Sequence, residues 1–152
     1  MNKPLHLLPR LSTRNGFSMI ELMIAIVVIG VLTAIAIPAY KNYTITGKIP
    51  LATSGLASEQ VQMEQFFQDN QTYLSAPGCT GATNGSNSPY FTFSCSGTPT
   101  ATAYTLQAVG TGSMAGFTYT VDQNSTRVTV AVPSGWTLPG SNCWVTRKGG
   151  VC

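Results

Sequence analysis

The sequence predicts an α+β fold in which a long N-terminal α-helix packs, by its C-terminal half, on a small four-stranded antiparallel sheet. Three observations lead to this prediction. Residues 22–39 form an apolar run without a charge, and residues 45–66 carry apolar side chains at helical spacing. From residue 90 onward, four short runs alternate between apolar and polar side chains, which is the pattern of half-buried strands. The N-terminal half of the helix is expected to protrude from the sheet domain.

The composition is unusual for a cytosolic enzyme. Of the 152 residues, 43% are hydrophobic and only 9% are charged, whereas an average protein has about a quarter of its residues charged. The length allows one ordinary domain with a small additional element. A chain this apolar is not expected to be disordered, and one this poor in charge does not resemble a cytosolic enzyme.

Residues 17–39 are predicted to be a helix of roughly 35 Å, long enough to cross a hydrocarbon core of about 30 Å. Lys3, Arg10 and Arg14 precede this segment, and the first acid of the chain is Glu21. By the positive-inside rule, the N-terminus stays cytoplasmic and everything after the segment is exported. A plain membrane anchor explains the hydrophobicity but not Glu21, because a charge at mid-span costs roughly 2.5–3.5 kcal/mol.

The order of the N-terminal segments differs from that of a secretory signal, in which the apolar region precedes the cleavage site. Here a basic leader ends at Gly16 and the apolar run follows, in the string GFSMIELMIAIVVIGVLTAIAIPAY. This string resembles the N-terminus of a type IV prepilin. The resemblance implies that prepilin peptidase removes residues 1–16 by cutting between Gly16 and Phe17. It also implies that Phe17 becomes N-methylated and that Glu21 is the buried glutamate of that family.

A role for Glu21 follows from the charge of the new N-terminus. The methylated amine of Phe17 stays cationic, so in a staggered bundle of helices it can meet Glu21 of a neighbouring subunit. A buried ion pair adds little net stability, but an unpaired carboxylate in an apolar core is destabilising. We therefore expect Glu21 to set the register of assembly and apolar burial to drive it.

Residues 40–69 are predicted to continue the helix as an amphipathic half that stops at Asp69-Asn70. Its apolar residues form one stripe at steps of three, four and seven: Ile45, Ile49, Ala52, Leu56, Met63 and Phe66. Glu59 interrupts the stripe and is expected to lie at a solvated edge of the helix. A continuous helix through Pro50 is expected, and an outright break at this proline is the alternative.

Residues 70–152 are predicted to form a disulfide-stabilised β-sheet domain. The alternating runs, each bounded by Gly, Pro, Asn or Ser, cover residues 90–95, 103–109, 117–121 and 127–131. The sequence Asp122-Gln123-Asn124-Ser125 indicates a hairpin turn, so the last two strands should pair antiparallel. The sheet needs cover on its apolar face, which only the amphipathic helix can provide. Residues 76–89 are expected to be a loop.

Four cysteines, Cys79, Cys95, Cys143 and Cys152, lie in the exported part. An even number in an oxidising compartment indicates disulfides, and four cysteines allow three pairings. The two short loops favour Cys79–Cys95 and Cys143–Cys152, each contributing about 3 kcal/mol in the loop-entropy model. A metal site built from all four thiolates is the alternative, although the C-x-x-C spacing is missing.

Two further strings in the C-terminal part resemble pilins. The tail CWVTRKGGVC is similar to the C-terminal disulfide loop of type IVa pilins. The wider pattern GSMAGFTYTVDQNSTR…GW…CWVTRKGG is similar to the PilE-type minor pilins.

The residue types present argue against an enzyme. Removal of residues 1–16 takes away three of the eight basic residues and the only histidine, which leaves five basic and five acidic residues. Nucleophilic triads and histidine-metal sites therefore lack a member. No glycine-rich phosphate loop follows a strand. We expect no catalytic site, no cofactor and no metal.

The leading functional hypothesis is a structural subunit, expected to be a minor pilin, of a type IV pilus that serves twitching motility, adhesion or DNA uptake. As the resemblance implies, its partners would be other pilin subunits in a homo- or hetero-oligomeric filament, and the prepilin peptidase and methylase. The subunit would wait in the inner membrane, as a single-pass protein with a cytoplasmic N-terminus, before it enters the extracellular filament.

Two alternatives remain open, a pseudopilin of type II secretion and a DNA-binding minor pilin for competence. The DNA-binding hypothesis rests on cations near aromatic residues in the sequence: Arg127, Arg147 and Lys148 with Trp136 and Trp144. With three cations, any DNA contact would be weak. The sequence therefore favours the structural interpretation, in which both tryptophans belong to the core or cover the sheet.

Overall fold

The computed structural model describes residues 16–79 and 88–152, so the predicted leader, apart from Gly16, lies outside the described residues. The chain divides into two compact units, Met1–Ala39 and Tyr40–Cys152, and one helix, α1 (Met19–Asn70), contributes to both. The remaining elements all belong to the second unit: η1 (Pro77–Cys79), β1 (Phe91–Cys95), β2 (Thr105–Gly110), η2 (Gly112–Met114), β3 (Thr118–Asp122) and β4 (Arg127–Ala131).

In the first unit, the apolar residues of α1 are not covered by any other described part of the chain. By length and composition α1 qualifies as a membrane-spanning helix, and none of its most apolar window is buried. Ile20, for example, is 67% exposed and Ile35 is 69% exposed. A continuous apolar surface of this kind is unstable in water, so this unit requires lipid or other apolar helices around it.

The helix passes through Pro50 without interruption, so the alternative of a break at this residue is wrong. Pro50 is exposed, and the hydroxyls of Thr53 and Ser54 donate hydrogen bonds to its carbonyl at 3.3 and 2.7 Å. Side chains on both sides of the proline are held in the core. Tertiary packing thus outweighs the missing backbone hydrogen bond of the proline.

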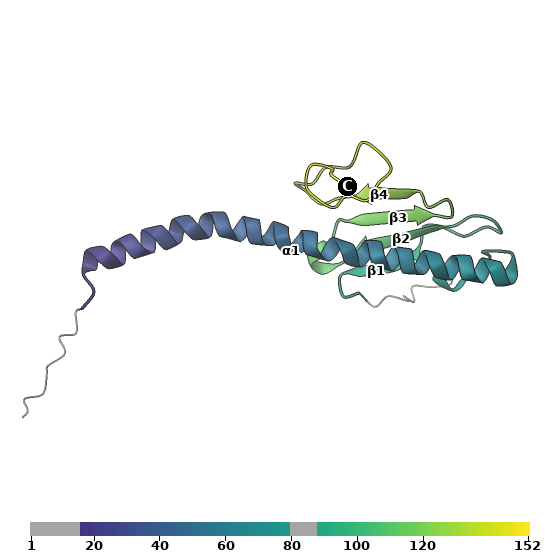
Figure 1. The fold of residues 1–152 in the computed structure, drawn as a ribbon, viewed down its shortest axis with the longest axis horizontal. Coiled ribbons are helices and arrows are strands. Elements are labelled where there is room, and N and C mark those ends of the chain that lie inside the picture. Colours follow the sequence, from purple (N-terminus) through teal and green to yellow (C-terminus); the bar gives the residue numbers. More distant parts are fainter. Residues whose placement is uncertain (1–15, 80–87) are drawn as a thin grey trace, which may run out of the picture. The chain divides into compact units, whose positions relative to one another are not determined.

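The four strands form one antiparallel sheet in the order β1-β2-β3-β4 (Figure 1), as the alternating runs predict. Phe93 pairs with Ala108, which in turn pairs with Tyr119, so these three residues share one face. The β3–β4 pair has an irregularity between Thr118 and Tyr119. The predicted hairpin is present at residues 122–125, where the Asp122 carboxylate accepts hydrogen bonds from the backbone N–H groups of Asn124 and Thr126.

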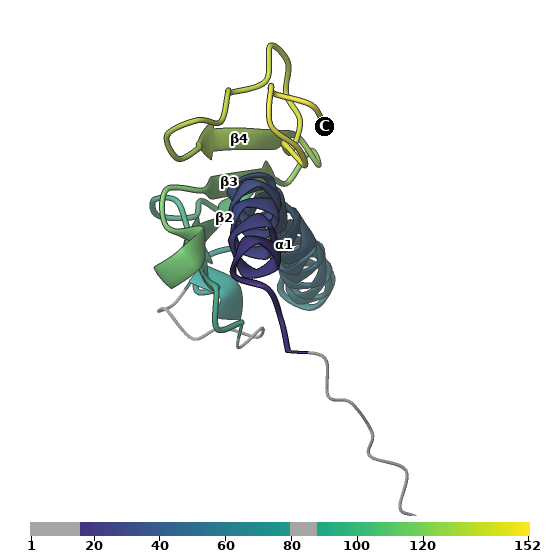
Figure 2. The ribbon, with the colours of Figure 1, turned by 90° about the vertical axis from the view of Figure 1, so that its left-hand side faces the viewer.

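The C-terminal half of α1 covers one face of the sheet (Figure 2) and supplies part of its core. Ile49, Ala52, Leu56 and Met63 are buried, while Ile45 and Phe66 pack at the margin, which confirms the predicted stripe. Gly55 lies against β1, where a β-carbon would overlap the ring of Phe93. A glycine, usually unfavourable inside a helix, is therefore required here by packing.

The disulfide Cys79–Cys95 joins η1 to β1, with a Cα–Cα distance of 4.9 Å. It is one of the two pairings favoured by the sequence. The bond holds the segment that connects α1 to the sheet against the core. Tyr73 and Ala76 of this segment are buried. Residues 80–87 of the predicted loop lie outside the described residues.

The prediction for Glu59 is wrong. The sequence places this residue at a solvated edge of the helix, but it is only 4% exposed and faces Gly78, Phe93 and Leu106. Its Oε1 atom is buried and has no hydrogen-bond partner among residues 16–79 and 88–152. The sequence could not indicate this burial, because the segment around Gly78 reaches over the helix only in the folded chain. Burying a polar atom without a partner is destabilising, by about 1–3 kcal/mol in mutational data.

Replacement of Glu59 by methionine should therefore stabilise the second unit. Methionine has a similar length and leaves no polar atom in the core, so the free energy of unfolding should rise by about 1–3 kcal/mol. Urea denaturation of a fragment spanning residues 40–152 measures this change.

The matched control is Glu64→Met on the same helix. The Glu64 carboxylate accepts hydrogen bonds from Tyr73 and Tyr104, so this change should lower the stability. A Glu59→Met fragment that is folded but no more stable than the wild type would contradict the account of Glu59.

Candidate functional site

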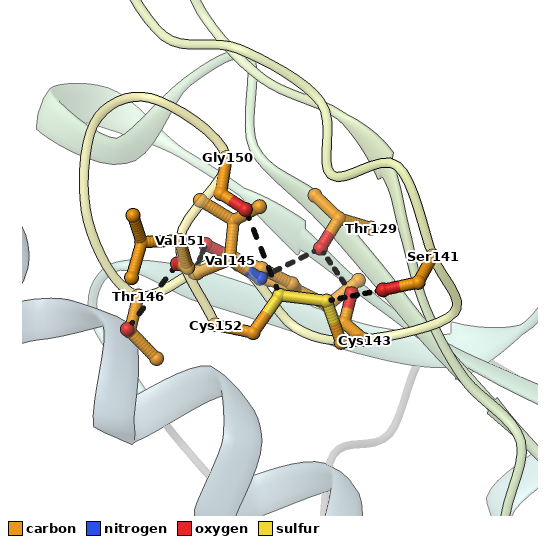
Figure 3. The surroundings of a disulfide bond; sticks show 9 residues. Thr129, Ser141, Cys143, Val145, Thr146, Gly150, Val151 and Cys152 are labelled. Atoms are coloured by element: carbon orange, nitrogen blue, oxygen red, sulfur yellow. Dashed lines mark hydrogen bonds between the residues drawn. A yellow bond between two sulfur atoms is a disulfide. The ribbon is translucent and has the colours of Figure 1, made fainter.

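A disulfide closes the C-terminal loop, and one threonine of β4 fastens the start of this loop to the edge of the sheet (Figure 3). Cys143 and Cys152 form the second disulfide, with a Cα–Cα distance of 6.1 Å. The Thr129 hydroxyl on β4 donates to the Cys143 carbonyl at 2.8 Å and accepts from the Val145 N–H at 2.9 Å. This buried hydroxyl therefore ties the start of the loop to β4.

Within the loop, the backbone turns back on itself and exposes two cations. The Thr146 N–H donates to the Val151 carbonyl at 2.8 Å, and residues 147 and 151 form an isolated bridge. The reversal uses Gly149 and Gly150, at φ values of 83° and 73° that disfavour other residues. Arg147 and Lys148, at the start of this turn, are exposed to solvent.

A third cation, Arg127, lies at the start of β4 against Trp144. Its guanidinium carbon is 4.8 Å from the centre of the indole ring, within the range of a cation–π contact. The indole N–H donates to the Thr120 carbonyl at 2.9 Å, which fixes the plane of the ring. Arg127 and Trp144 line an open groove of about 610 Å³, which we call the cationic groove; its other wall is α1 at Pro50, Thr53 and Ser54.

The second tryptophan has a different place. Trp136 packs edge-on against Phe117, with 4.8 Å between the ring centres, and belongs to the margin of the core. The sequence groups both tryptophans with the three cations, but the structure brings only Trp144 to one of them. For Trp136 the core interpretation is correct. Trp144 combines a packing role with a position in the cationic groove.

A second open groove, of about 490 Å³, lies where the C-terminal end of α1 meets the β3–β4 turn. We call it the amide groove, because glutamines dominate its lining: Gln60, Gln65, Gln68 and Gln123, with Val61, Glu64 and Ser125. The Gln60 amide donates to the Ser125 hydroxyl at 2.9 Å and to the Asp122 carbonyl at 3.3 Å. The Gln123 side-chain oxygen accepts from the Tyr104 N–H at 3.2 Å.

Glu64, on the wall of the amide groove, holds two tyrosines. Its carboxylate accepts hydrogen bonds from the Tyr73 hydroxyl at 3.0 Å and the Tyr104 hydroxyl at 2.9 Å. Burial raises the pKa of Tyr104 above its ordinary value, and the hydrogen bond and charge of Glu64 raise it further. The same causes, in the same order, raise the pKa of Tyr73. The cluster joins α1 to the segment that follows it and to the residue before β2.

The residues predicted to act in processing and assembly lie at the other end of the chain. Phe17 precedes α1 and is 82% exposed, and Glu21 lies in the first turn of the helix. Their predicted partners are an enzyme and neighbouring subunits, so a single chain does not bring them together with any group. Among residues 16–79 and 88–152, no cluster of three His, Cys, Asp or Glu side chains is arranged to hold a metal.

Several residues of the site were not found from the sequence. Thr129 and Gln123 each stand in a strand or turn pattern like many polar residues, and nothing local marks their long-range bonds. Glu64 lies nine positions before Tyr73 and forty before Tyr104. No spacing rule relates such positions, so only the fold reveals the cluster.

Comparison with protein families gives two matches that together cover most of the described chain. Residues 38–124 match the family described as "Type IV minor pilin ComP, DNA uptake sequence receptor". Residues 11–37 match the prokaryotic N-terminal methylation motif. The first match spans more than half of the chain and includes every lining residue of the amide groove except Ser125.

The chain is also similar to individual pilins, at about 30% sequence identity. The fimbrial protein EcpC of Eikenella corrodens is 29% identical over 100 residues, which are 64% of this chain and 65% of that protein. The type IV major fimbrial protein FimA of Dichelobacter nodosus is 32% identical over 98 residues, 64% of this chain and 61% of that protein. Both alignments span less than two thirds of the relatives' own length.

One solved structure supports the fold. The non-core minor pilin PilV of Neisseria meningitidis superposes with a TM-score of 0.53 at 14% identity, over 66% of this chain and 98% of that one. The arrangement of helix and sheet is therefore that of the type IV pilin fold, as the sequence predicts.

The tyrosine cluster leads to a prediction about pH. Because the pKa values of Tyr73, Tyr104 and Tyr119 are raised in the folded state, the unfolded chain loses these protons first as the pH rises above 10.0. The protonated tyrosines therefore contribute their full share to the free energy of unfolding below that pH, and this contribution should decrease as the pH rises further. In the folded fragment, part of the phenolate absorbance should appear only at higher pH than in urea. Tyr104→Phe should remove a share of this delayed absorbance, and an unchanged titration would contradict the assignment.

Proposed function

Since the chain belongs to the type IV minor pilin family described as ComP, DNA uptake sequence receptor, we propose that it is a minor pilus subunit whose second unit binds DNA. That it is a type IV pilin subunit, and not an enzyme, follows from the family itself. We therefore propose DNA binding, rather than motility or adhesion, as the main role of this subunit in the pilus. The sequence favours a structural interpretation of the cations; we place DNA binding above it because of the family description, although the matched residues 38–124 end before the three cations.

The observation that carries this proposal is the placement of three cations on β4 and the loop fastened to it. Arg147 and Lys148 are exposed on the loop, and Arg127 lies in the cationic groove against Trp144. They are three of the five basic residues that follow the predicted cleavage point. Arginine and lysine side chains in such a cluster bind the phosphates of DNA without regard to sequence.

The expected strength of this contact follows from the number of cations. Three phosphate contacts give a slope of about −2.7 in a plot of log binding constant against log salt concentration. Binding by one subunit is therefore weak at physiological salt. Several subunits in one filament would contact the same DNA molecule, and such multivalency raises the apparent affinity without new contacts.

Charge removal tests this proposal. The triple variant Arg127→Gln, Arg147→Gln and Lys148→Gln should lose measurable binding to a random-sequence duplex at low salt. Each single change should reduce the salt slope by about one unit. Fluorescence anisotropy of the full-length protein in detergent, titrated with a labelled duplex at several salt concentrations, measures both quantities.

Lys41→Gln is the matched control, because it removes one exposed charge from α1 roughly 13 Å along the helix from Pro50. It should leave binding near the wild-type level. Wild-type protein that does not bind DNA at low salt, or a triple variant that binds as the wild type does, would contradict the proposal.

The N-terminal segment supports a pathway of processing and assembly. In this proposal, prepilin peptidase removes residues 1–16 between Gly16 and Phe17, and Phe17 is then methylated. Residues 17–39 hold the subunit in the inner membrane with a cytoplasmic N-terminus, and afterwards pack among the helices of other pilins. Residues 40–69 and 70–152 remain outside the membrane as the amphipathic half of α1 and the sheet domain.

Within this pathway, Glu21 sets the register of assembly by pairing with the N-terminal amine of a neighbouring subunit. Its support is its place in the first turn of α1, on a helix that is otherwise apolar as far as Tyr40. A carboxylate without a partner among apolar helices is destabilising, so wrong registers are disfavoured.

Removal of the Glu21 carboxylate should impair assembly into filaments but leave insertion into the membrane intact. Glu21→Val subunits should enter the membrane normally, because the change removes a charge from the apolar segment. Their amount in sheared filaments, measured by quantitative mass spectrometry relative to the membrane fraction, should fall well below that of the wild type. Ile24→Val is a control for side-chain volume and should assemble. Glu21→Val subunits that enter filaments as efficiently as wild-type subunits would exclude the role.

A further inference from the structure

We propose that the amide groove is the part of this protein that distinguishes one DNA sequence from another, by contact with base edges. This inference rests on the proposed DNA-binding function, but assigns sequence recognition to residues that are separate from the three cations. In the proposed function the cations contact phosphate, and a phosphate contact carries no sequence information. Recognition of sequence requires side chains that offer defined hydrogen-bond donors and acceptors to the bases.

The two grooves lie along one side of α1. Ser54 lines the cationic groove, while Val61, Glu64 and Gln68 line the amide groove, and successive residues of this series are three to seven positions apart. Such spacing places them on one stripe of a helix. From Ser54 to Gln68 the helix rises by roughly 21 Å, which is the length of about six base pairs at 3.4 Å each. One duplex held by its phosphates at the cationic groove therefore reaches the amide groove.

The charges near the amide groove decide which part of the DNA can enter it. Glu64 lies on its wall, and Asp122 supports the turn on its other side. Two carboxylates repel a phosphate, so the backbone of the DNA is directed toward Arg127 and the C-terminal loop. The bases are uncharged, and the exocyclic amines of adenine and cytosine donate hydrogen bonds that amide and carboxylate oxygens accept.

The side chains of the amide groove are suited to this contact. Gln60 is held in one orientation by Asp122 and Ser125, and the oxygen of Gln123 is held by the backbone of Tyr104. Gln65 and Gln68 are exposed on α1. A glutamine amide forms a bidentate pair with adenine, and the major groove of DNA is about 12 Å wide and admits a helix.

The test compares sequence preference with overall affinity. Full-length protein in detergent is used to select duplexes from a pool with a randomised central segment, and the enriched duplex and a shuffled version are then compared by anisotropy. In the variant Gln65→Ala, Gln68→Ala, the preference for the enriched duplex should fall by at least about fivefold for each lost contact. Affinity for the shuffled duplex and its salt slope should stay unchanged, because the three cations are intact.

A control variant, Ser58→Ala with Gln62→Ala, changes exposed polar residues of α1 that do not line the groove, and should keep the preference. Alanine favours helix at all four positions, so both variants should fold, and circular dichroism checks this. A wild type that binds DNA but enriches no sequence overturns this inference alone. So does a Gln65→Ala, Gln68→Ala variant that keeps the full preference. A wild type that binds neither duplex overturns the proposed function together with it.

Discussion

The tight contact between α1 and the core face of the sheet is the constraint on which the described second unit depends. Gly55 allows the helix to approach the ring of Phe93, and Leu56 and Met63, which follow it in the helix, are completely buried. Burial of each large apolar side chain stabilises the fold by about 1.5–3 kcal/mol. Because this contact fixes the rotation of the helix about its axis, it also decides that Ser54 and Gln68 border the open grooves. The surface that faces solvent is therefore a consequence of the core.

Much of the fold could be predicted from the sequence because its signals are periodic. The stripe from Ile45 to Phe66 and the alternation in residues 91–95 report which face is buried without any knowledge of the partner element. In residues 127–131 the same signal misleads, because the polar Thr129 is buried while Val130 is exposed. The features that could not be predicted are contacts between residues far apart in the sequence. The burial of Glu59, the bonds of Glu64 with two tyrosines and the double contact of Thr129 depend on segments that meet only in the folded chain. Pro50 stays helical because neighbouring residues are anchored in the core.

The candidate site likewise has residues that could be predicted from the sequence and residues that could not. Arg127, Arg147 and Lys148 could be singled out from the sequence as a cluster of charge, yet Trp144 and Trp136 could not be told apart. Only their surroundings separate a ring that meets Arg127 from one that packs on Phe117. The amide groove had no signal at all, since its glutamines look like ordinary solvated residues of a helix.

The fastening of the C-terminal loop has a consequence for protein engineering. Both ends of the loop are fixed, by the bond between Cys143 and Cys152 and by the hydroxyl of Thr129, so its tip contributes little to the stability of the sheet. The entropy of closing a loop rises only slowly with its length. A short epitope or a chemical handle grafted between Lys148 and Gly149 would thus be displayed on the surface of an intact fold, ready for imaging or affinity capture.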